Sequence, residues 1–202
     1  MFIALSQRLI KHKDYDELRE ALSLEWGEFF DKELKEFLPL PLSFKLPFYR
    51  YKNVIKGCIL SGGNDLSIFD NSDENIMRDN YEKEIIKHCI DDEIPILAIC
   101  RGAQLLAHFF HSSIKKCENH IGKHLVRYEN GCEFEVNSFH HYAITKLGKD
   151  LECLVRAEDE SIEAFKHKNL PFYATMWHIE RKGGLIDRSI LQEFKHKLRT
   201  QK

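Results

Sequence analysis

The sequence lacks a long apolar run, and neither sign of charge dominates it. No stretch of its 202 residues approaches the about 18 consecutive apolar residues of a membrane-spanning helix. The first eight residues lack the basic start, apolar segment and cleavage site of a signal peptide. The net charge is −2, from 30 Lys and Arg against 32 Asp and Glu, so there is no broad basic field for duplex nucleic acid. We therefore expect a cytoplasmic protein that binds neither membranes nor nucleic acid.

Signatures of several other protein classes are also missing. The six cysteines show no paired CxxC spacing, which argues against a disulfide framework in a reducing compartment. The turn at Gly62 and Gly63 is not followed by the Lys-Ser/Thr pair of a phosphate-binding loop. No internal repeat, low-complexity tract or clear linker is visible, and 43% of the residues are hydrophobic. We predict a single globular domain over residues 1–202.

Short apolar runs that alternate with amphipathic segments predict an α/β fold. Buried strands are predicted over 54–60 and 95–99, and a helix follows each of them, over 81–90 and 101–107. Such pairs favour a parallel sheet that is covered by helices on both faces. The second half is expected to be more antiparallel. The other predicted elements are strands over 2–5, 125–128, 132–136, 153–157, 162–165 and 171–175, a helix over 15–34 capped by Asp14, an extended edge segment over 37–42, and a closing helix over 188–198.

The strongest chemical signal is a cysteine between a buried strand and a helix. Cys100 follows the apolar run 95–99 and stands directly before the predicted helix. Small residues, Ala98 and Gly102, flank it at two positions on either side, as a sharp nucleophile elbow requires. The amides of a helix N-terminus favour the thiolate form of such a cysteine. We interpret Cys100 as the nucleophile and most of the other cysteines as buried structural residues.

A cysteine nucleophile needs a base, and the base needs a group that orients it. His178 and Glu180 are spaced i, i+2, so on an extended chain both side chains lie on the same face. The turn at Gly62 and Gly63 follows the strand over 54–60, and glycines let backbone amides approach a ligand closely. One such amide, together with the amide of Arg101, could form an oxyanion hole.

These motifs, in this order, resemble the γ-glutamyl hydrolase (peptidase C26) branch of the class I glutamine amidotransferase-like superfamily. The matching segments are Ser61-Gly62-Gly63, Arg78-Asp79 with Glu82, Ile99 to Gln104, Val136 to His141, Ile162-Glu163-Ala164 and Trp177 to Glu180. The resemblance implies a flavodoxin-like fold, no cofactor, and hydrolysis of a γ-glutamyl amide through a thioester on Cys100. It also implies a Cys100–His178–Glu180 triad and an oxyanion hole at Gly63 and Arg101. Substrate contacts are expected at Gln104, Ser138, Phe139, His140, Tyr142 and Arg78. Ala98, Met176 and Ile179 depart from the usual glycine, glutamine and proline of the family.

The segments 18–26 and 37–41 further resemble a specialised group in this branch, the γ-glutamyl-CDP-amidate hydrolases of capsule phosphoramidate biosynthesis. This resemblance implies a nucleotide-linked substrate that is cleaved to glutamate and cytidine diphosphoramidate. A diphosphate is bound by cationic side chains. The candidates for such residues at the cleft are Arg78, Lys115, Lys116, His120, His124, Arg181 and Lys182.

Three other functions stay open: a glutaminase subunit that passes ammonia to a separate synthetase, a γ-glutamyl hydrolase for another small amide, and a non-catalytic thiol sensor or binding module. The spacing of Cys117, His120 and His124 could suit zinc, but no fourth ligand is signalled nearby. We therefore predict no metal site. The oligomeric state is not indicated.

Overall fold

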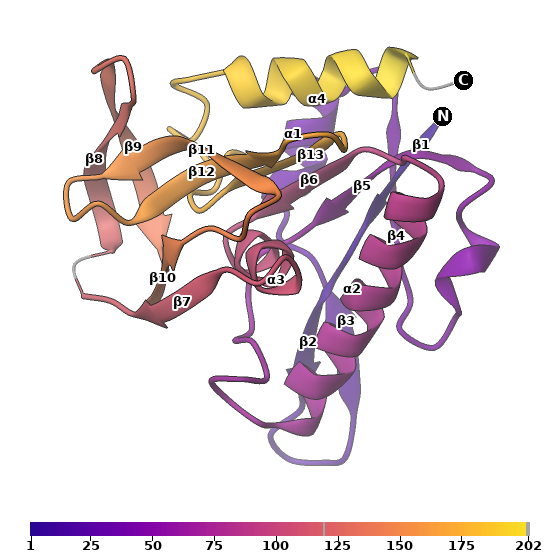
Figure 1. The fold of residues 1–202 in the computed structure, drawn as a ribbon. Helices are drawn as coiled ribbons and strands as arrows, with labels where there is room; N and C mark the ends of the chain where they lie inside the picture. The colour runs from indigo at the N-terminus through magenta and orange to yellow at the C-terminus, as the bar shows by residue number, and fades with distance from the viewer. Residues whose placement is uncertain (119, 201–202) are drawn as a thin grey trace.

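The computed structural model describes residues 1–118 and 120–200, and it has an eleven-stranded sheet with helices on both faces (Figure 1). The strands of this sheet are β1 (Phe2–Leu5), β4 (Leu38–Pro41), β5 (Ile55–Leu60), β6 (Ile96–Ile99), β7 (Ser113–Lys116), β8 (Ile121–Tyr128), β9 (Glu133–Phe139), β10 (Tyr142–Lys146), β11 (Leu151–Ala157), β12 (Ile162–His167) and β13 (Phe172–Thr175). The helices are α1 (Glu25–Glu33), η1 (Phe48–Arg50), α2 (Asp73–Asp91), α3 (Arg101–Phe109) and α4 (Ser189–Thr200). A separate hairpin joins β2 (Arg8–Lys11) to β3 (Leu18–Ala21). Within the described ranges, no helix combines the length and apolar character that a membrane span requires.

One half of the sheet is parallel and the other half is antiparallel. The strand order is β4-β1-β5-β6-β13-β12-β11-β8-β9, and the neighbours from β4 to β13 run parallel. The strands from β12 onward pair antiparallel, and β10 extends this half by pairing with β12 and β7. The prediction of a largely parallel centre with an antiparallel portion in the second half is confirmed. Pro39 and Pro41 lie in β4 at the sheet edge, where a missing amide donor costs no ladder hydrogen bond.

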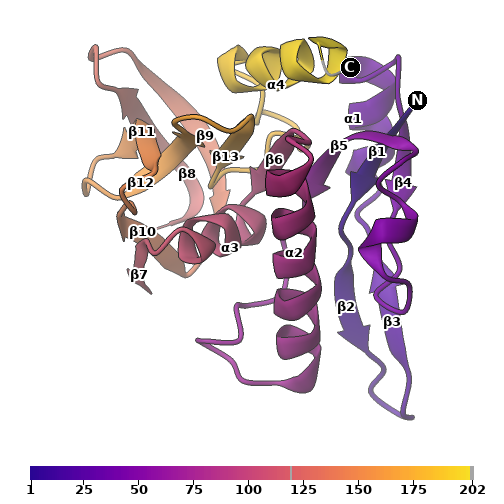
Figure 2. The same ribbon diagram turned by 45° about the vertical axis from the view of Figure 1, so that its right-hand side comes forward.

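Each face of the parallel strands packs against its own pair of helices. Along β6, Ile96 and Ala98 join the hydrophobic cluster under α2 and α3, whereas Leu97 and Ile99 join the cluster under α1 and α4. This alternation is the period of two that a strand imposes on its side chains. Figure 2 shows α2 and α3 on one side of the sheet and α1 and α4 on the other. Burial on both faces explains why β5 and β6 read as continuous apolar runs.

The prediction of a helix over 15–34 is wrong in its first half. Residues Leu18–Ala21 form β3, which pairs with β2, and the helix begins only at Glu25. Leu18 is exposed, so the apolar spacing that suggested a helix has no core to face there. The Glu20 carboxylate instead accepts hydrogen bonds from the Ser43 hydroxyl at 2.9 Å and the Phe44 amide at 2.7 Å. Tertiary pairing has overridden a helical pattern.

The helix predicted over 81–90 begins earlier, at Asp73, so Arg78 lies inside α2 and not before it. The first turns of α2 bury polar side chains, namely those of Asn75, Arg78, Asp79 and Glu82. Apolar periodicity cannot signal a helix whose buried face is polar. The other predicted strands and helices are confirmed to within a few residues, whereas β2, β7 and β10 carried no signal that the sequence analysis used.

Candidate active site

The turn after β6 has the geometry of a nucleophile elbow. Cys100 has φ 53° and ψ −107°, a backbone conformation that is costly for a residue with a side chain. The turn is held because the Cys100 amide donates to the Thr175 carbonyl at 2.8 Å. Gly102 has no room for a side chain, since a Cβ there would collide with the Leu60 carbonyl. The thiol is therefore fixed at the carboxyl edge of the parallel strands, where α3 begins.

The imidazole of His178 lies between this cysteine and a carboxylate. His178 Nδ1 is 2.6 Å from Glu180 Oε1, and both side chains are buried. Asn137 holds the backbone of His178 on both sides, accepting from its amide at 2.9 Å and donating to its carbonyl at 3.1 Å. A Cβ built on Gly62 would lie 3.4 Å from Cys100 Cβ and 3.6 Å from His178 Nε2. The Nε2 edge of the imidazole and the cysteine therefore meet above Gly62, and Glu180 binds the opposite nitrogen.

The surroundings of His178 keep its imidazole protonated at neutral pH. Burial alone would lower its pKa, but the neighbouring Cys100 and Glu180 outweigh burial and raise the pKa to about 9. An imidazolium beside a thiol favours the thiolate, which is the nucleophilic form of cysteine. Cys100 and His178 can thus supply a nucleophile and a proton donor next to each other.

The loop after β5 is held from behind by Arg78. The fully buried guanidinium donates to the carbonyls of Ser61 at 2.7 Å, Gly62 at 3.2 Å and Gly63 at 2.6 Å. In a trans peptide the carbonyl and the following amide point in opposite directions. Because the Gly62 carbonyl points at Arg78, the Gly63 amide points away from it, and Gly63 lines the same pocket as Cys100. This orientation suits the predicted oxyanion hole.

Arg78 therefore does not lie where a substrate contact was predicted. Its Nε atom donates to Glu82 at 3.0 Å, and Glu82 also pairs with Arg101, which in turn pairs with Asp79. All four side chains are buried, and their charges balance. Burial lowers the pKa of Arg78 to about 10, and Glu82 opposes this shift. Arg101 has its side chain in this network, while its amide stands in the first turn of α3, where a helix leaves amides without an intrahelical acceptor.

A pocket of about 140 Å³ opens beside Cys100 and His178. Most of the predicted site residues line it, namely Gly63, Arg101, Gln104, Phe139, His140 and Tyr142. Gln104 Nε2 donates to the Tyr142 carbonyl at 2.9 Å, which fixes that wall. Ser138 does not contribute its hydroxyl, because the fully buried Oγ donates to the His120 carbonyl at 2.7 Å.

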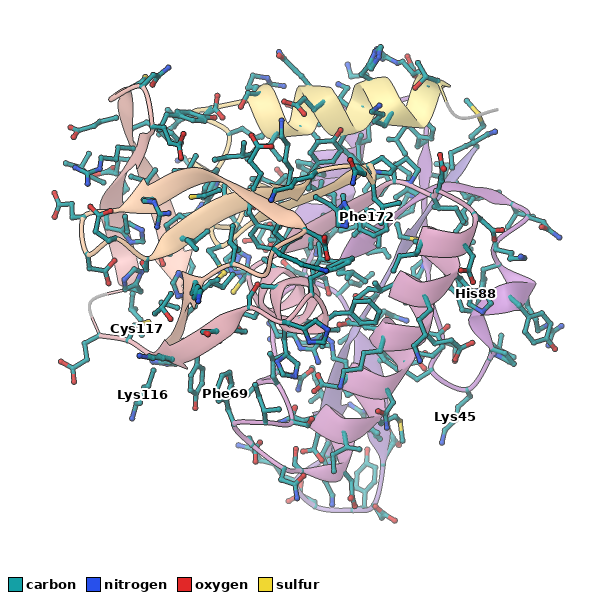
Figure 3. The ribbon with its side chains drawn as sticks, viewed as in Figure 1. Lys45, Phe69, His88, Lys116, Cys117 and Phe172 are labelled. Atoms are coloured by element: carbon teal, nitrogen blue, oxygen red, sulfur yellow. The ribbon has the colours of Figure 1, made fainter. Side chains whose placement is uncertain are left out.

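Besides Arg101, two arginines line this pocket, Arg8 and Arg181, and only Arg181 was a candidate from the sequence. Arg181 is 4.9 Å from the ring centroid of Phe139, a cation–π contact. Arg8 lies on β2 and packs against Gly63, where a Cβ would collide with its guanidinium. Since β2 was not recognised as a strand, nothing in the sequence pointed to Arg8. The candidate cations Lys115, Lys116 and Lys182 are exposed and do not line the pocket, and Figure 3 shows Lys116 projecting outward beside Cys117.

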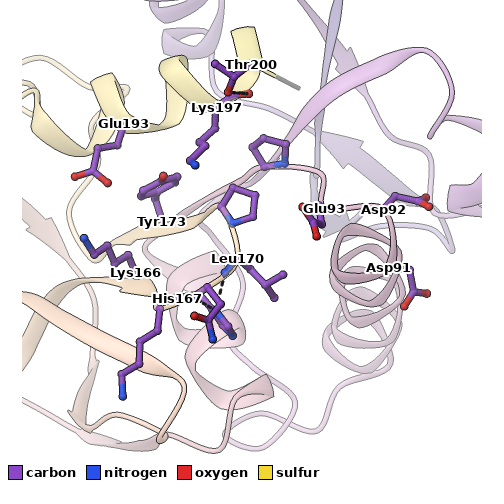
Figure 4. Close-up of a pocket in the computed structure, with 14 residues that line it drawn as sticks. Asp91, Asp92, Glu93, Lys166, His167, Leu170, Tyr173, Glu193, Lys197 and Thr200 are labelled. Atoms are coloured by element: carbon purple, nitrogen blue, oxygen red, sulfur yellow. Dashed lines mark hydrogen bonds between the residues drawn. The ribbon is translucent and has the colours of Figure 1, made fainter. Parts of the chain in front are cut away.

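A larger cavity, of about 820 Å³, lies at the opposite edge of the sheet (Figure 4). Pro95 and Pro171, which line it, precede β6 and β13, whereas Cys100 follows β6. Its wall mixes charges of both signs, such as Lys166, Glu193 and Lys197. Ligands of parallel α/β sheets bind at the carboxyl ends of the strands, so the smaller pocket is the candidate active site.

The comparisons with known proteins agree with this geometry. A family model described as Peptidase C26 matches residues 37–180. A gamma-glutamyl-CDP-amidate hydrolase from Campylobacter jejuni is 52% identical over 195 residues, which cover 96% of this chain and 97% of that protein. A glutamine-hydrolysing GMP synthase component from Methanococcus vannielii is 32% identical over 136 residues, 62% of this chain and 65% of that protein.

A solved structure of a glutamine amidotransferase from Thermotoga maritima has the same fold, with a TM-score of 0.65 at 17% identity. The alignment covers 98% of this chain and 82% of that one. The resemblance drawn from the motifs is confirmed: this chain belongs to the peptidase C26 family, on a class I glutamine amidotransferase-like fold.

Proposed function

We propose that this chain hydrolyses a γ-glutamyl amide with Cys100 as nucleophile, His178 as acid and base, and Glu180 as the group that orients His178. The observation that carries the proposal is the row of thiol, imidazole and carboxylate at the carboxyl edge of the sheet. Family membership and the 52% identical relative support the reaction class. Gln104, Phe139, His140 and Tyr142 would surround the glutamyl group.

The reaction has two balanced steps. The Cys100 thiolate attacks the γ-carbonyl carbon, and the amides of Gly63 and Arg101 stabilise the oxyanion that forms. The carbon–nitrogen bond then breaks, and the leaving nitrogen takes the proton of the His178 imidazolium. This leaves a γ-glutamyl thioester on Cys100. His178 accepts a proton from water as the water attacks the thioester, which releases glutamate and restores the cysteine.

We further propose that the natural substrate is γ-glutamyl-CDP-amidate, which would give glutamate and cytidine diphosphoramidate. The pocket of about 140 Å³ is smaller than the roughly 300–1,000 Å³ of a site that encloses a whole drug-sized ligand. We therefore expect it to hold the glutamyl group and to leave the nucleotide outside. Arg8 and Arg181 stand at the pocket and can pair with a diphosphate, which arginine binds through two parallel hydrogen bonds. The name of the Campylobacter jejuni relative supports the same substrate.

A substrate panel tests this function. Glutamate release is measured from glutamine, γ-glutamyl putrescine, a folate polyglutamate and γ-glutamyl-CDP-amidate. We expect the nucleotide substrate to be hydrolysed fastest, and Arg181→Gln to raise its KM by about tenfold, the scale of one charge-assisted contact. Lys182→Gln, a change at the neighbouring exposed cation, serves as the matched control and leaves KM unchanged. Faster hydrolysis of free glutamine would point to a glutaminase subunit instead.

The raised pKa of His178 predicts the upper limb of the pH profile. His178 is protonated below about pH 9, so kcat/KM should fall with an apparent pKa near 9 as the general acid loses its proton. The free energy of unfolding should also fall as His178 loses its proton. The protonated form stabilises the fold below the ordinary pKa of about 6.5, and this contribution is lost as the pH rises through about 9. Rates and urea unfolding measured from pH 6 to 10 test both.

The matched variant for this profile is Glu180→Gln, which removes the carboxylate and keeps the shape. Because Glu180 raises the pKa of His178, the falling limb should move to lower pH in this variant. A limb that stays in place would show that another group controls the profile.

A further inference from the structure

A second cluster of titratable side chains lies behind one wall of the catalytic pocket. Glu163 on β12 is fully buried, and three histidines face its carboxylate. His120 Nδ1 and His140 Nε2 lie 3.3 and 3.4 Å from Glu163 Oε1, and His124 Nε2 lies 3.6 Å from Oε2. His120 precedes β8, His124 lies on it, and His140 follows β9, so the cluster ties three strands together. We call these four residues the histidine–glutamate cluster.

The atoms that face one another in this cluster are buried and lack ordinary partners. His120 Nδ1, His124 Nε2, His140 Nε2 and both Glu163 oxygens make no hydrogen bond to any described residue. Buried polar atoms are almost always paired, so an unpaired group of this size needs an explanation.

The spacing of these atoms is that of donors around a metal ion. Zinc–nitrogen bonds are about 2.0–2.1 Å and zinc–oxygen bonds about 2.0–2.2 Å, so neighbouring donors of a tetrahedron lie about 3.3–3.5 Å apart. The three imidazole–carboxylate distances of 3.3, 3.4 and 3.6 Å are close to this value. The ligand atoms of His120, His124 and Glu163 all lie within 4.8 Å of one another, whereas His140 belongs to a second such group, with Cys117 and His120. A hydrogen bond between imidazole and carboxylate would be shorter, at about 2.7–2.9 Å.

In two of the histidines, the ring nitrogen that faces away from Glu163, here called the outer nitrogen, donates a hydrogen bond to another residue. His120 Nε2 lies 3.0 Å from the Asp159 carboxylate, and His140 Nδ1 lies 3.1 Å from the Tyr142 carbonyl. Because carboxylate and carbonyl oxygens only accept, each outer nitrogen carries the proton. In the neutral form, the inner nitrogen then presents a lone pair to the cluster. Metal-binding histidines show this arrangement, with the second nitrogen donating to a carboxylate or a backbone carbonyl.

We propose that the histidine–glutamate cluster binds one divalent transition-metal ion, with zinc the best fit, through His120 Nδ1, His124 Nε2 and the Glu163 carboxylate, the three residues whose ligand atoms lie together. Zinc sites with three protein ligands complete their tetrahedron with a water molecule. His140 Nε2 lies beside the site, 3.4 Å from Glu163 Oε1. No metal was expected from the sequence, because it shows no further ligand near His120 and His124, whereas the fold supplies Glu163 from a distant segment.

Cys117 is outside the proposed ligand set, although it lies near. Its sulfur is 3.9 Å from His140 Nδ1, the nitrogen that faces the Tyr142 carbonyl, and it does not belong to the group formed by His120, His124 and Glu163. Through Glu163 and the neighbouring His140, a bound ion would fix the position of one wall of the catalytic pocket. His140 holds the Tyr142 carbonyl, the same atom that accepts from Gln104 Nε2, and all three residues line the catalytic pocket.

Metal titration of the untagged 202-residue chain tests the site. The Cys100→Ala background removes the active-site thiol as a competing ligand, and chelator dialysis gives the metal-free protein. We expect one equivalent of Co²⁺ to produce the intense visible bands of a tetrahedral ion, without a thiolate charge-transfer band in the near ultraviolet. Zinc should displace the cobalt and, at about 100 times Kd, raise Tm by roughly 5–10 °C.

Variants separate the proposed ligands from other histidines. Glu163→Gln and His124→Gln should lose the visible bands and the Tm shift, and His196→Gln on the exposed face of α4 should keep both. His124 is partly exposed, so its variant still reports if Glu163→Gln fails to fold. The proposal is overturned if the wild type binds neither ion stoichiometrically, because protons then hold the cluster together. It is also overturned if both ligand variants bind as well as wild type, or if a thiolate band places Cys117 among the ligands.

Discussion

Replacing Cys100 with alanine is expected to lower kcat for γ-glutamyl amide hydrolysis by about 10⁴- to 10⁶-fold. Removal of the nucleophile from a coupled triad costs rates of this order, because the remaining groups can only bind and polarise the substrate. The substrate KM should change little, since the pocket walls at Gln104 and Tyr142 do not depend on the sulfur. Initial rates of glutamate release from wild type and variant measure both constants.

The structure of the Cys100→Ala variant should stay intact. The elbow is held by the hydrogen bond from the residue 100 amide to the Thr175 carbonyl and by Gly102, and alanine keeps both. Circular dichroism and Tm therefore serve as the folding check. Cys132→Ala, at an exposed cysteine in the turn before β9, is the matched control and should retain full activity.

Acyl capture gives a second readout that does not depend on rates. Mass spectrometry of rapidly quenched wild type should find a glutamyl adduct on the peptide that contains Cys100, and the variant should show none. An active Cys100→Ala protein, or an adduct on another cysteine, would contradict the proposed nucleophile.

The parts of the site that the sequence predicted are those that local chemistry determines. An apolar strand followed at once by a cysteine and a helix specifies the elbow, because small residues at 98 and 102 are needed within a few positions of it. The spacing of His178 and Glu180 likewise acts within one short segment. The two side chains do meet, with 2.6 Å between Nδ1 and Oε1, although Ile179 and Glu180 lie in a turn and not on an extended strand.

The parts that the sequence did not predict depend on contacts between distant segments. Arg8 reaches the pocket from β2, which pairs with β3 and is held to the loop after β5 by hydrogen bonds between Asn64 and Leu9, and that hairpin was hidden by a helical apolar pattern. Glu163 meets three histidines from other segments at distances that no local pattern encodes. Arg78 was expected to touch substrate, yet the fold buries it under the loop that it supports. Long-range pairing thus decided which charged residues face the pocket.

Glu82→Ala is the change with the largest expected effect on stability. Glu82 is fully buried and pairs with both Arg78 and Arg101, so its loss leaves one positive charge uncompensated inside the protein. Breaking a buried ion pair by removing one partner costs about 3–5 kcal/mol. For a chain of this size, that lowers Tm by roughly 10 °C. Urea or thermal unfolding measures the change in the free energy of unfolding.

The matched control is Glu84→Ala, two residues further along α2. Glu84 is partly exposed and accepts one weak hydrogen bond, from the Phe48 amide at 3.3 Å, so its loss should cost within about 1 kcal/mol. Equal effects of the two variants would show that the buried charges do not stabilise the fold. A Glu82→Gln variant isolates the charge, because glutamine keeps the shape and can still accept from one arginine.

The effect on activity follows from the same contacts. Arg78 orients the Gly62 and Gly63 carbonyls, and Glu82 holds Arg78 at 3.0 Å. Loosening Arg78 misaligns the amide proposed to stabilise the oxyanion, a group whose loss costs about 10²- to 10³-fold in kcat. Glu82→Gln should therefore lower kcat more than it raises KM at temperatures where the variant is fully folded. A change confined to KM would instead assign the buried network to substrate binding.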